Sequence, residues 1–134
     1  MTIITNFSQQ HIVQLSELYK NTGWGERSVA ETSQCVSNSQ ICIGILNSDS
    51  QLVGFTRVIT DFIYKALILD VMVSADYRGT GLGQELIQQV KRHEKLNKVK
   101  HFELYCSSEM EAFYEGFGFS TEVDGIKLMR CTNE

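Results

Sequence analysis

A short glycine-rich stretch, Arg78-Gly79-Thr80-Gly81-Leu82-Gly83, holds the residue types and spacing that most clearly suggest chemistry. It follows a near-continuous apolar run over residues 66–73 and leads directly into an amphipathic helix. Glycines at a helix start let backbone N–H groups close on an anion, and the helix dipole favours negative charge there. Arg78 adds a permanent cation beside these groups. The stretch therefore predicts a pyrophosphate-binding turn.

Two familiar nucleotide motifs do not fit this turn. A P-loop ends in Gly-Lys-Ser/Thr, whereas Leu82-Gly83-Gln84 stands here. A Rossmann fingerprint needs a third glycine where the sequence has Gln84, although Glu103 lies where a ribose-binding acid would be expected. The first strand of a Rossmann fold would also open a βαβ series, whereas most of a sheet is predicted before this strand.

A third pattern, Arg/Gln-x-x-Gly-x-Gly/Ala after a buried strand, is matched in full by Arg78, Gly81 and Gly83. It is the acyl-CoA-binding motif of the GNAT superfamily of acetyl-CoA-dependent N-acetyltransferases, which this chain resembles. Residues 112–119, Ala-Phe-Tyr-Glu-Gly-Phe-Gly-Phe, are similar to the family's second signature, Ala-x-x-Phe-Tyr-x-x-x-Gly-Phe, with a shortened lead-in. The two signatures occur in the family's order, which strengthens the resemblance.

The resemblance implies acetyl-CoA as co-substrate, no metal, and roles for individual residues. Tyr114 stands where the family has a tyrosine directed at the sulfur of coenzyme A, so it is the implied acid for the thiolate. In the family the central strand separates from its neighbour and offers backbone N–H groups to the thioester and pantetheine. The implied CoA-binding residues are Val71, Met72, Val73, Arg78, Gly79, Thr80, Gly81, Leu82, Gly83 and Gln84.

The acceptor side is less clearly marked. An alkyl amine with a pKa near ~10.4 is mostly protonated at pH 7, so it must lose a proton before it can attack. Asp70 interrupts an otherwise apolar strand, where a carboxylate is costly unless it is hydrogen-bonded or faces a cleft. Asp70 is the candidate base, with a purely structural role as the alternative. Trp24 and Glu26, between the first two helices, and Asp61 are the candidate substrate-binding residues.

Apolar patterning predicts an α/β fold, a mixed sheet flanked by helices in the order β-α-α-β-β-β-α-β-α-β. This order resembles that of the acyl-CoA N-acyltransferase (GNAT) fold. Ser8, Ser28 and Ser108 are predicted helix caps, and Glu31 completes a capping box with Ser28. The right-handed βαβ rule makes the strand at 99–105 parallel to the central strand. Strands are expected at 2–6, 41–46, 52–59, 66–73, 99–105 and 126–131, and helices at 9–20, 28–36, 80–95 and 108–115.

Length predicts one domain over residues 1–134, and the resemblance implies that it is an N-acetyltransferase domain. No apolar run approaches the ~20 residues of a membrane helix, and the N-terminus lacks signal-peptide features, so a cytoplasmic protein without a membrane partner is expected. A formal charge of −4 argues against a nucleic-acid partner. Four cysteines without a Cys-x-x-Cys pair suggest neither a zinc site nor a disulfide framework, and Cys42, Cys106 and Cys131 are expected to be buried.

Three functions remain open at this stage. The leading hypothesis is transfer of the acetyl group of acetyl-CoA to a primary amine of a small molecule, by direct attack in a ternary complex, in a monomer or homodimer. The second is acetylation of a protein N-terminus or lysine, which favours an open peptide groove. The third is a CoA-binding sensor or interaction module without catalysis, against which the presence of Tyr114 argues.

Overall fold

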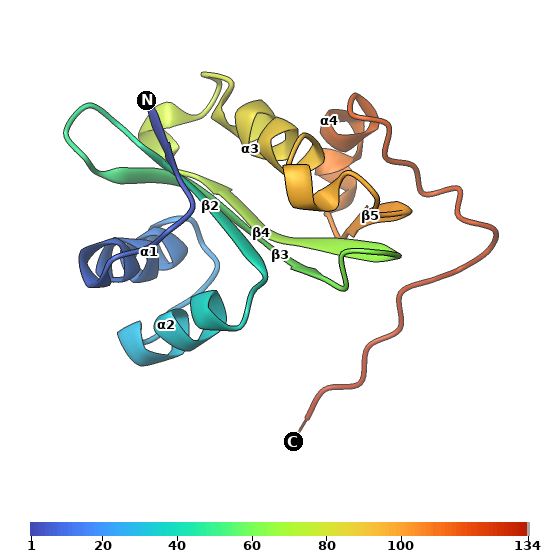
Figure 1. Cartoon of the computed structure of the whole chain (residues 1–134), viewed down its shortest axis with the longest axis horizontal. Helices are drawn as coiled ribbons and strands as arrows, with labels where there is room; N and C mark the ends of the chain where they lie inside the picture. Colours follow the sequence, from blue (N-terminus) through green and yellow to red (C-terminus); the bar gives the residue numbers. More distant parts are fainter. Residues whose placement is uncertain (134) are drawn as a thin grey trace.

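The apolar stretches form a five-stranded sheet in the order β1-β2-β3-β4-β5 (Figure 1). The structure is a computed structural model, and it describes residues 1–133. Neighbouring strands are antiparallel up to β4, and β4 and β5 are parallel, which confirms the predicted parallel pair. The strands are β1 (Thr2–Ile4), β2 (Ile41–Leu46), β3 (Leu52–Thr60), β4 (Lys65–Val73) and β5 (His101–Leu104).

Two helices lie on each face of the sheet (Figure 1): α1 (Gln9–Asn21) and α2 (Val29–Ser37) on one, α3 (Leu82–Lys91) and α4 (Glu111–Glu115) on the other. The first two begin where the sequence predicts. The Ser8 hydroxyl accepts a hydrogen bond from the backbone N–H of His11, and Ser28 and Glu31 form the expected capping box. These caps satisfy N–H groups that a helix start otherwise leaves open.

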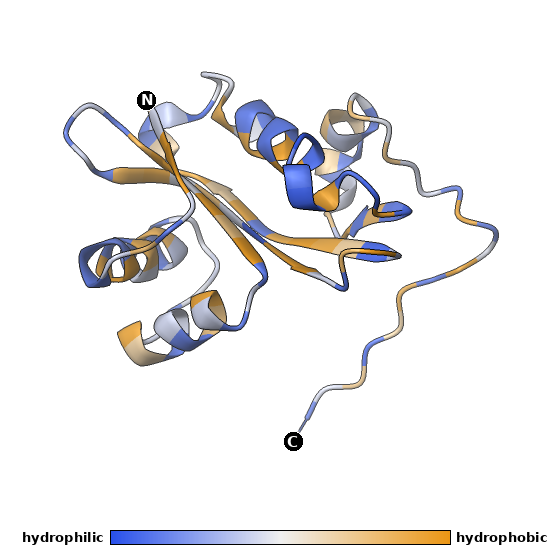
Figure 2. Cartoon of the chain, in the orientation of Figure 1, coloured by the Kyte–Doolittle hydropathy of each residue, from blue (hydrophilic) through white to orange (hydrophobic). Residues whose placement is uncertain are grey.

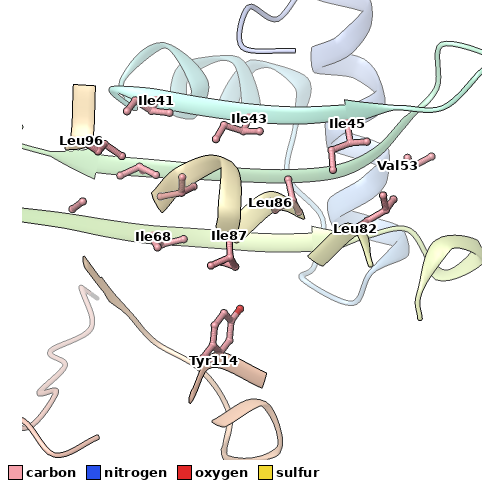
Figure 3. Close-up of a cluster of buried hydrophobic side chains, with 13 residues drawn as sticks. Ile41, Ile43, Ile45, Val53, Ile68, Leu82, Leu86, Ile87, Leu96 and Tyr114 are labelled. Atoms are coloured by element: carbon pink, nitrogen blue, oxygen red, sulfur yellow. The ribbon is translucent and has the colours of Figure 1, made fainter. Parts of the chain in front are cut away.

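The core is divided by the sheet into two layers, with apolar strands between helices that are polar outside (Figure 2). On one face, Leu82, Leu86 and Ile87 of α3 pack over the strands, as their helical spacing predicts (Figure 3). Val90 of α3 belongs to the same cluster. On the other face, α1 covers the sheet with a smaller cluster that includes Leu15 and Leu18. The two clusters therefore lie on opposite faces of the same sheet, and both include residues of β2, β3 and β4.

Two helix predictions are wrong in detail. The helix expected at 80–95 ends at Lys91, and a 3₁₀ turn at Glu94–Leu96 follows, because the His93 ring accepts the backbone N–H of Lys95 and caps a new turn. Ser108 does not cap the next helix; it begins a 3₁₀ turn, Ser108–Met110, that runs into α4. Helix ends depend on the local capping hydrogen bonds, and neither the 3₁₀ turn at Ser108–Met110 nor α4 begins with a side-chain cap.

The strand expected at 126–131 is also wrong, because no regular element follows α4 among residues 1–133. Alternating apolar residues form a strand only where a neighbouring strand pairs with them, and no strand does so here. The burial of Cys106 and Cys131 fails with it: Cys106 lies beyond the end of β5, and both side chains are exposed. Cys42 in β2 is buried as predicted, and this burial raises the pKa of its thiol to about 11.

No helix among residues 1–133 combines the length and the apolar character needed to cross a membrane.

Candidate active site

Strand β4 changes the direction of its side chains halfway along its length. Its pairing with β3 shifts by one residue near Asp70, whose φ of +55° is left-handed. Before this bulge, Ile68 faces the α3 layer; beyond it, Val71 and Val73 pack on that layer, while Met72 joins the α1 layer. A bulge re-aims side chains in this way, and aspartate tolerates the left-handed conformation better than most residues. The bulge therefore turns the only acid of this strand toward α1.

The second half of β4 lacks a neighbour on its β5 side. The parallel pairing runs from Lys65 opposite His101 to Ile68 opposite Leu104 and then stops. Residues 69–73 have no strand partner on that side within the part of the chain that the structure describes. Backbone N–H and C=O groups are obligatory hydrogen-bonding groups, so an unpaired strand edge next to a core is open to a ligand. Val71, Met72 and Val73, three of the predicted CoA-binding residues, occupy this edge.

The glycine-rich turn follows β4 after a single 3₁₀ turn, Ala75–Tyr77. Gly79 and Gly81 have φ values of +77° and +91°, and a Cβ at either position would meet no atom within 4 Å. Both glycines are therefore required by backbone conformation and not by crowding. The first helical bond of α3 runs from the N–H of Glu85 to the carbonyl of Gly81. The backbone N–H groups of residues 82–84 have no acceptor within the helix. They lie at the N-terminus of α3, where the helix dipole favours a bound anion.

Other residues of the turn have separate roles. The Thr80 hydroxyl donates to the backbone carbonyl of Tyr77 and holds the turn closed. The exposed Arg78 side chain makes no ion pair with any of residues 1–133, so its charge is available to a ligand. A Cβ at Gly83 would lie 3.3 Å from the ring of Phe113. Gly83 therefore also lets α4 pack closely against α3, a role that the motif alone does not reveal.

We expect Arg78→Ala to weaken the binding of CoA by about 10- to 100-fold, because a charge-assisted contact to phosphate contributes about 1.5–3 kcal/mol. Binding of pantetheine, which lacks the phosphates, should change little. Isothermal titration of both ligands measures the difference. Arg92→Ala, an exposed arginine at the other end of α3, is the matched control for loss of charge. An equal loss for both ligands would show that Arg78 is structural.

Tyr114 reaches from α4 into the core beside α3. Its side chain is 7% exposed, and its ring makes edge contacts with Phe113 and Phe119. Figure 3 shows the ring extending toward Ile87 with the hydroxyl end leading. Burial, together with the nearby Cys106, raises the pKa of this phenol to about 12. The hydroxyl is therefore protonated at neutral pH, and among residues 1–133 it has no hydrogen-bond partner.

Asp70 is held by three donors, all of which contact the same oxygen. Its Oδ2 accepts hydrogen bonds from the Tyr19 hydroxyl at 2.5 Å, Arg57 Nε at 2.7 Å and Arg27 Nη1 at 3.3 Å. Asp70 is 7% exposed, yet Oδ1 has no hydrogen-bond partner among residues 1–133. Every fully buried side-chain oxygen among these residues has a hydrogen-bond partner. Oδ1 has none, so it keeps some access to solvent. One oxygen of this carboxylate is anchored and the other is free.

The partners of Asp70 form a compact cluster. The Arg27 guanidinium lies 4.0 Å from the centre of the Tyr19 ring, a cation–π contact. Burial and the hydrogen bond to Asp70 raise the pKa of Tyr19 well above its ordinary value. Burial lowers the pKa of Arg57, but the hydrogen bond and charge of Asp70 outweigh it and raise the pKa overall. Tyr19 and Arg57 therefore keep the protonated forms that Asp70 needs, and the cluster ties the loop after α1 to the central strand.

The three partners were not among the predicted site residues. A signal for Arg57 exists in the sequence, because it stands in an apolar strand just as Asp70 does in the next one. Opposite charges in adjacent buried strands indicate a pair, since an unpaired buried charge is strongly unfavourable. Arg27 lies in a polar loop and Tyr19 on a regular helical face, and neither carries a comparable signal.

The structure brings some of the predicted acceptor residues together and separates others. Trp24 lies beside the Asp70 cluster, with its ring 6.5 Å from that of Tyr19 in an edge contact. Glu26 is exposed and lines a hollow along α1 with Lys20, and Arg27 of the Asp70 cluster lines the same hollow. Asp61 lies in the β3–β4 turn before β4 begins, and the nine residues of β4 put roughly 27 Å between that end and Val73. Its role there is local.

Asp61 closes the β3–β4 turn. Its Oδ1 accepts the backbone N–H groups of Ile63, Tyr64 and Lys65 at 2.8–3.1 Å. These three bonds lower the pKa of the carboxyl. A carboxylate used in this way is occupied by its own turn, so the geometry gives Asp61 a structural explanation that its sequence position did not suggest.

Tyr114 and Asp70 lie on opposite faces of the sheet, since Tyr114 belongs to the α3 layer and Asp70 contacts Tyr19 of α1. The unpaired half of β4 lies between them. A ligand that occupies this edge can meet groups from both layers. The unpaired edge therefore has a tyrosine hydroxyl in the layer on one face of the sheet and a carboxylate in the layer on the other.

Comparison with known proteins agrees with this geometry. A family model described as an acetyltransferase (GNAT) domain matches residues 38–121. An uncharacterized N-acetyltransferase, ycf52, of Pyropia yezoensis is 30% identical over 89% of this chain and 70% of its own length. The histone acetyltransferase TAP1 of Glycine max is 28% identical over 88% of this chain, which spans 55% of that protein.

A solved structure shows the same fold. A protein of Xanthomonas campestris pv. campestris assigned to the GNAT family superposes with a TM-score of 0.80 and 25% identity, over 99% of this chain and 94% of that one. This chain therefore combines the fold of that structure with a sequence that matches the acetyltransferase (GNAT) family model. The chain belongs to the GNAT superfamily and is an N-acetyltransferase by family and fold.

Proposed function

We propose that residues 1–134 form a single N-acetyltransferase domain that transfers the acetyl group of acetyl-CoA to a primary amine of a small molecule, by direct attack in a ternary complex. One observation carries the proposal: the unpaired half of β4 ends next to a turn whose N–H groups and arginine are also free. A long ligand with an anionic part and an amide-rich part fits these hydrogen-bond donors, which follow one another from the strand edge to the turn. Coenzyme A has both parts.

The two ends of the thioester substrate would be held by different chemistry. The free N–H groups at the start of α3 and the Arg78 guanidinium would bind the pyrophosphate. The edge of β4 at Val71 to Val73 would pair with the pantetheine amides, and an N–H there would donate to the thioester carbonyl oxygen. A donor already in place stabilises the negative charge that develops on this oxygen when the amine attacks.

The reaction then needs one proton to leave the amine and one to reach the sulfur. The neutral amine nitrogen forms a bond to the carbonyl carbon, the carbon–sulfur bond breaks, and the products are an acetamide and CoA. We assign Tyr114 to donate a hydrogen bond to the departing sulfur, since its hydroxyl is protonated and free. We assign the free Oδ1 of Asp70 to accept the amine N–H, while Oδ2 stays anchored.

The acceptor class is the open part of this proposal. A small molecule is favoured because Arg27 binds Asp70 and holds the loop after α1, with Trp24, against the centre of the sheet. A protein lysine is the second candidate, and the observation that favours it is the similarity to a relative named as a histone acetyltransferase.

A rate assay separates the two candidates. The chain is incubated with acetyl-CoA and either small amines (diamines, amino sugars, amino acid amides) or lysine-containing peptides, and CoA release and product mass are measured. We expect the highest kcat/KM with a small amine. Turnover of peptides alone would support the second candidate. Tight acetyl-CoA binding without turnover of any amine would support a non-catalytic CoA-binding module.

Acetyl-CoA is expected to raise the melting temperature by several degrees. Ligand at about 100 times its dissociation constant stabilises the native state by about 2.7 kcal/mol. Gly81→Asp should remove most of this shift, because it adds a side chain and a negative charge where the phosphates would bind. Gly125→Asp makes the same change at another left-handed glycine, in the C-terminal segment, and should keep the shift. A shift with NAD or ATP but not with acetyl-CoA would contradict the assignment of the cofactor.

A further inference from the structure

A hollow of about 340 Å³ lies between α2 and β3, on the face of the sheet that α1 and α2 cover (Figure 1). Sites for small ligands measure about 300–1,000 Å³, so this one can hold a small molecule. None of the residues assigned above to coenzyme A lines it. Its lining comes from α2 and the residue after it, and from β3: Glu31, Gln34, Cys35, Asn38, Arg57 and Ile59.

Arg57 joins this hollow to the Asp70 cluster. Its Nε donates to Oδ2 of Asp70 at 2.7 Å, and its Nη1 donates to the Ser39 hydroxyl at 3.4 Å. The third nitrogen, Nη2, has no hydrogen-bond partner among residues 1–133, although the side chain is only 15% exposed. Every fully buried side-chain nitrogen there has a partner, so Nη2 keeps access to open space, and the hollow is the space that Arg57 lines. An unused guanidinium donor that is largely desolvated indicates a site for an anionic group.

The Asp70 cluster carries one more positive charge than negative charges. Arg27 and Arg57 both pair with Asp70, and neither makes another ion pair among residues 1–133. Glu31 is the only acid of the described chain that lines the hollow, and its Oε1 accepts the backbone N–H and the hydroxyl of Ser28. The hollow along α1 is lined by two acids and two bases, so its charges are already balanced. A carboxylate beside Arg57 would neutralise the excess charge.

The same arginine places such a carboxylate near the free oxygen of Asp70. Arg57 pairs with Leu69 across β3 and β4, so the backbone of Arg57 lies next to that of Asp70. A guanidinium holds its nitrogens in one rigid plane, so an anion on Nη2 lies close to the carboxyl group that Nε holds. In an α-amino acid, a single carbon joins the amine to the carboxylate. The amine of an amino acid held in this way can therefore reach Oδ1 of Asp70, the oxygen without a partner among residues 1–133.

We propose that the hollow binds the carboxylate of a free α-amino acid through Arg57, and that this amino acid is the acetyl acceptor, with its nitrogen at Oδ1 of Asp70. Its side chain would lie against Cys35 and Ile59, the least polar residues of the lining. The nitrogen–carbon bond forms, the carbon–sulfur bond of acetyl-CoA breaks, and one proton passes in net from the nitrogen to the CoA sulfur. The carboxylate stays unchanged and positions the amine. The inference rests on the proposed function and names the acceptor class within it.

Pairs of amino acids and their amides test the proposal, because the two members of a pair differ only in the carboxylate. For each proteinogenic amino acid and its amide, kcat/KM with acetyl-CoA is measured from CoA release and product mass. We expect at least one amino acid to exceed its amide by about 10- to 100-fold, which corresponds to one charge-assisted contact. This preference would run against basicity, because a carboxylate raises the pKa of a neighbouring amine and leaves less of it neutral at pH 7.

Two variants assign the effect to the hollow. Arg57→Lys keeps a cation for Asp70 but loses Nη2, so the preference for acid over amide should fall by about 10-fold or more. Gln34→Glu adds a negative charge to the wall, at an exposed side chain without a hydrogen bond among residues 1–133. It should raise KM for the amino acid by about 3- to 10-fold. Gln10→Glu makes the same change at an exposed position of α1 and is the matched control. A loss of folded protein alone would lower the rates with acid and amide equally and leave their ratio unchanged.

Binding without turnover separates this inference from the proposed activity. Each amino acid is titrated calorimetrically into wild-type and Arg57→Lys protein that is saturated with CoA. An amino acid that binds wild type about 10-fold more tightly than Arg57→Lys, but is not acetylated, would support the carboxylate site and count against the proposed acetyl transfer. Amides that are acetylated as fast as their amino acids would overturn the inference and leave the proposed function standing. A preference for the acid that survives both variants would also overturn it, because the carboxylate would then bind elsewhere.

Discussion

Replacing Tyr114 by phenylalanine is expected to lower kcat by about 100-fold while the affinity for acetyl-CoA barely changes. The variant keeps the ring that packs against Phe113 and Phe119 and removes only the hydroxyl. General acid assistance contributes about 100- to 10,000-fold, and we expect the low end. A phenol with a pKa of about 12 does not readily give its proton to a thiolate whose acid has a pKa near ~8.5, so a hydrogen bond is the larger part of its role.

The measurement uses an amine acceptor that gives a rate with wild type, under conditions where the chemical step limits turnover. Tyr105→Phe removes a hydroxyl from an exposed tyrosine just beyond β5 and is the matched control. A Tyr114→Phe rate within about twofold of wild type would remove Tyr114 from the mechanism. An equal fall for both variants would point to a general change at this end of the sheet.

Replacing Asp70 by alanine is expected to lower the free energy of unfolding by about 3–5 kcal/mol, the usual range when one partner of a buried ion pair is lost. Arg57, whose side chain is 15% exposed, would lose its counter-charge, and the Tyr19 hydroxyl would lose its acceptor. Alanine also adopts the left-handed backbone of this bulge less readily than aspartate. Chemical denaturation of both proteins measures the difference. A loss below about 1 kcal/mol would mean that the cluster contributes little to the fold.

Asp70→Asn is the matched variant that separates stability from chemistry. Asparagine keeps the shape, the tolerance for positive φ and an oxygen that accepts a hydrogen bond, so the loss of stability should be smaller than for alanine. If Oδ1 accepts the proton of the amine, kcat should fall by about 100-fold or more in a folded Asp70→Asn protein. A kcat near the wild-type value would leave Asp70 with a structural role only.

The glycine-rich turn, the helix after it and the first two helix caps follow from short-range rules, and each could be predicted from a few consecutive residues. Left-handed glycines at 79 and 81, serine caps at 8 and 28, and apolar spacing along α3 depend on backbone conformation and helix geometry within one or two turns. The parallel pairing of β5 with β4 follows as well, because the handedness of crossovers leaves few alternatives. The cytoplasmic location stays a prediction, since a fold does not reveal its compartment.

Long-range contacts decided the rest. The partners of Asp70 come from α1, the loop after it and β3, and the distance in sequence from Tyr19 to Asp70 is 51 residues. A one-residue bulge places Asp70 and Tyr114 on opposite faces, and no local pattern reveals a bulge that depends on how two strands pair. The segment 126–131 shows the same limit, because its alternation is that of a strand but a strand also needs a neighbour. The alternation of side chains shows which face of a segment can be buried. Whether the segment becomes a strand depends on an unpaired strand edge beside it, and only the assembled sheet decides that.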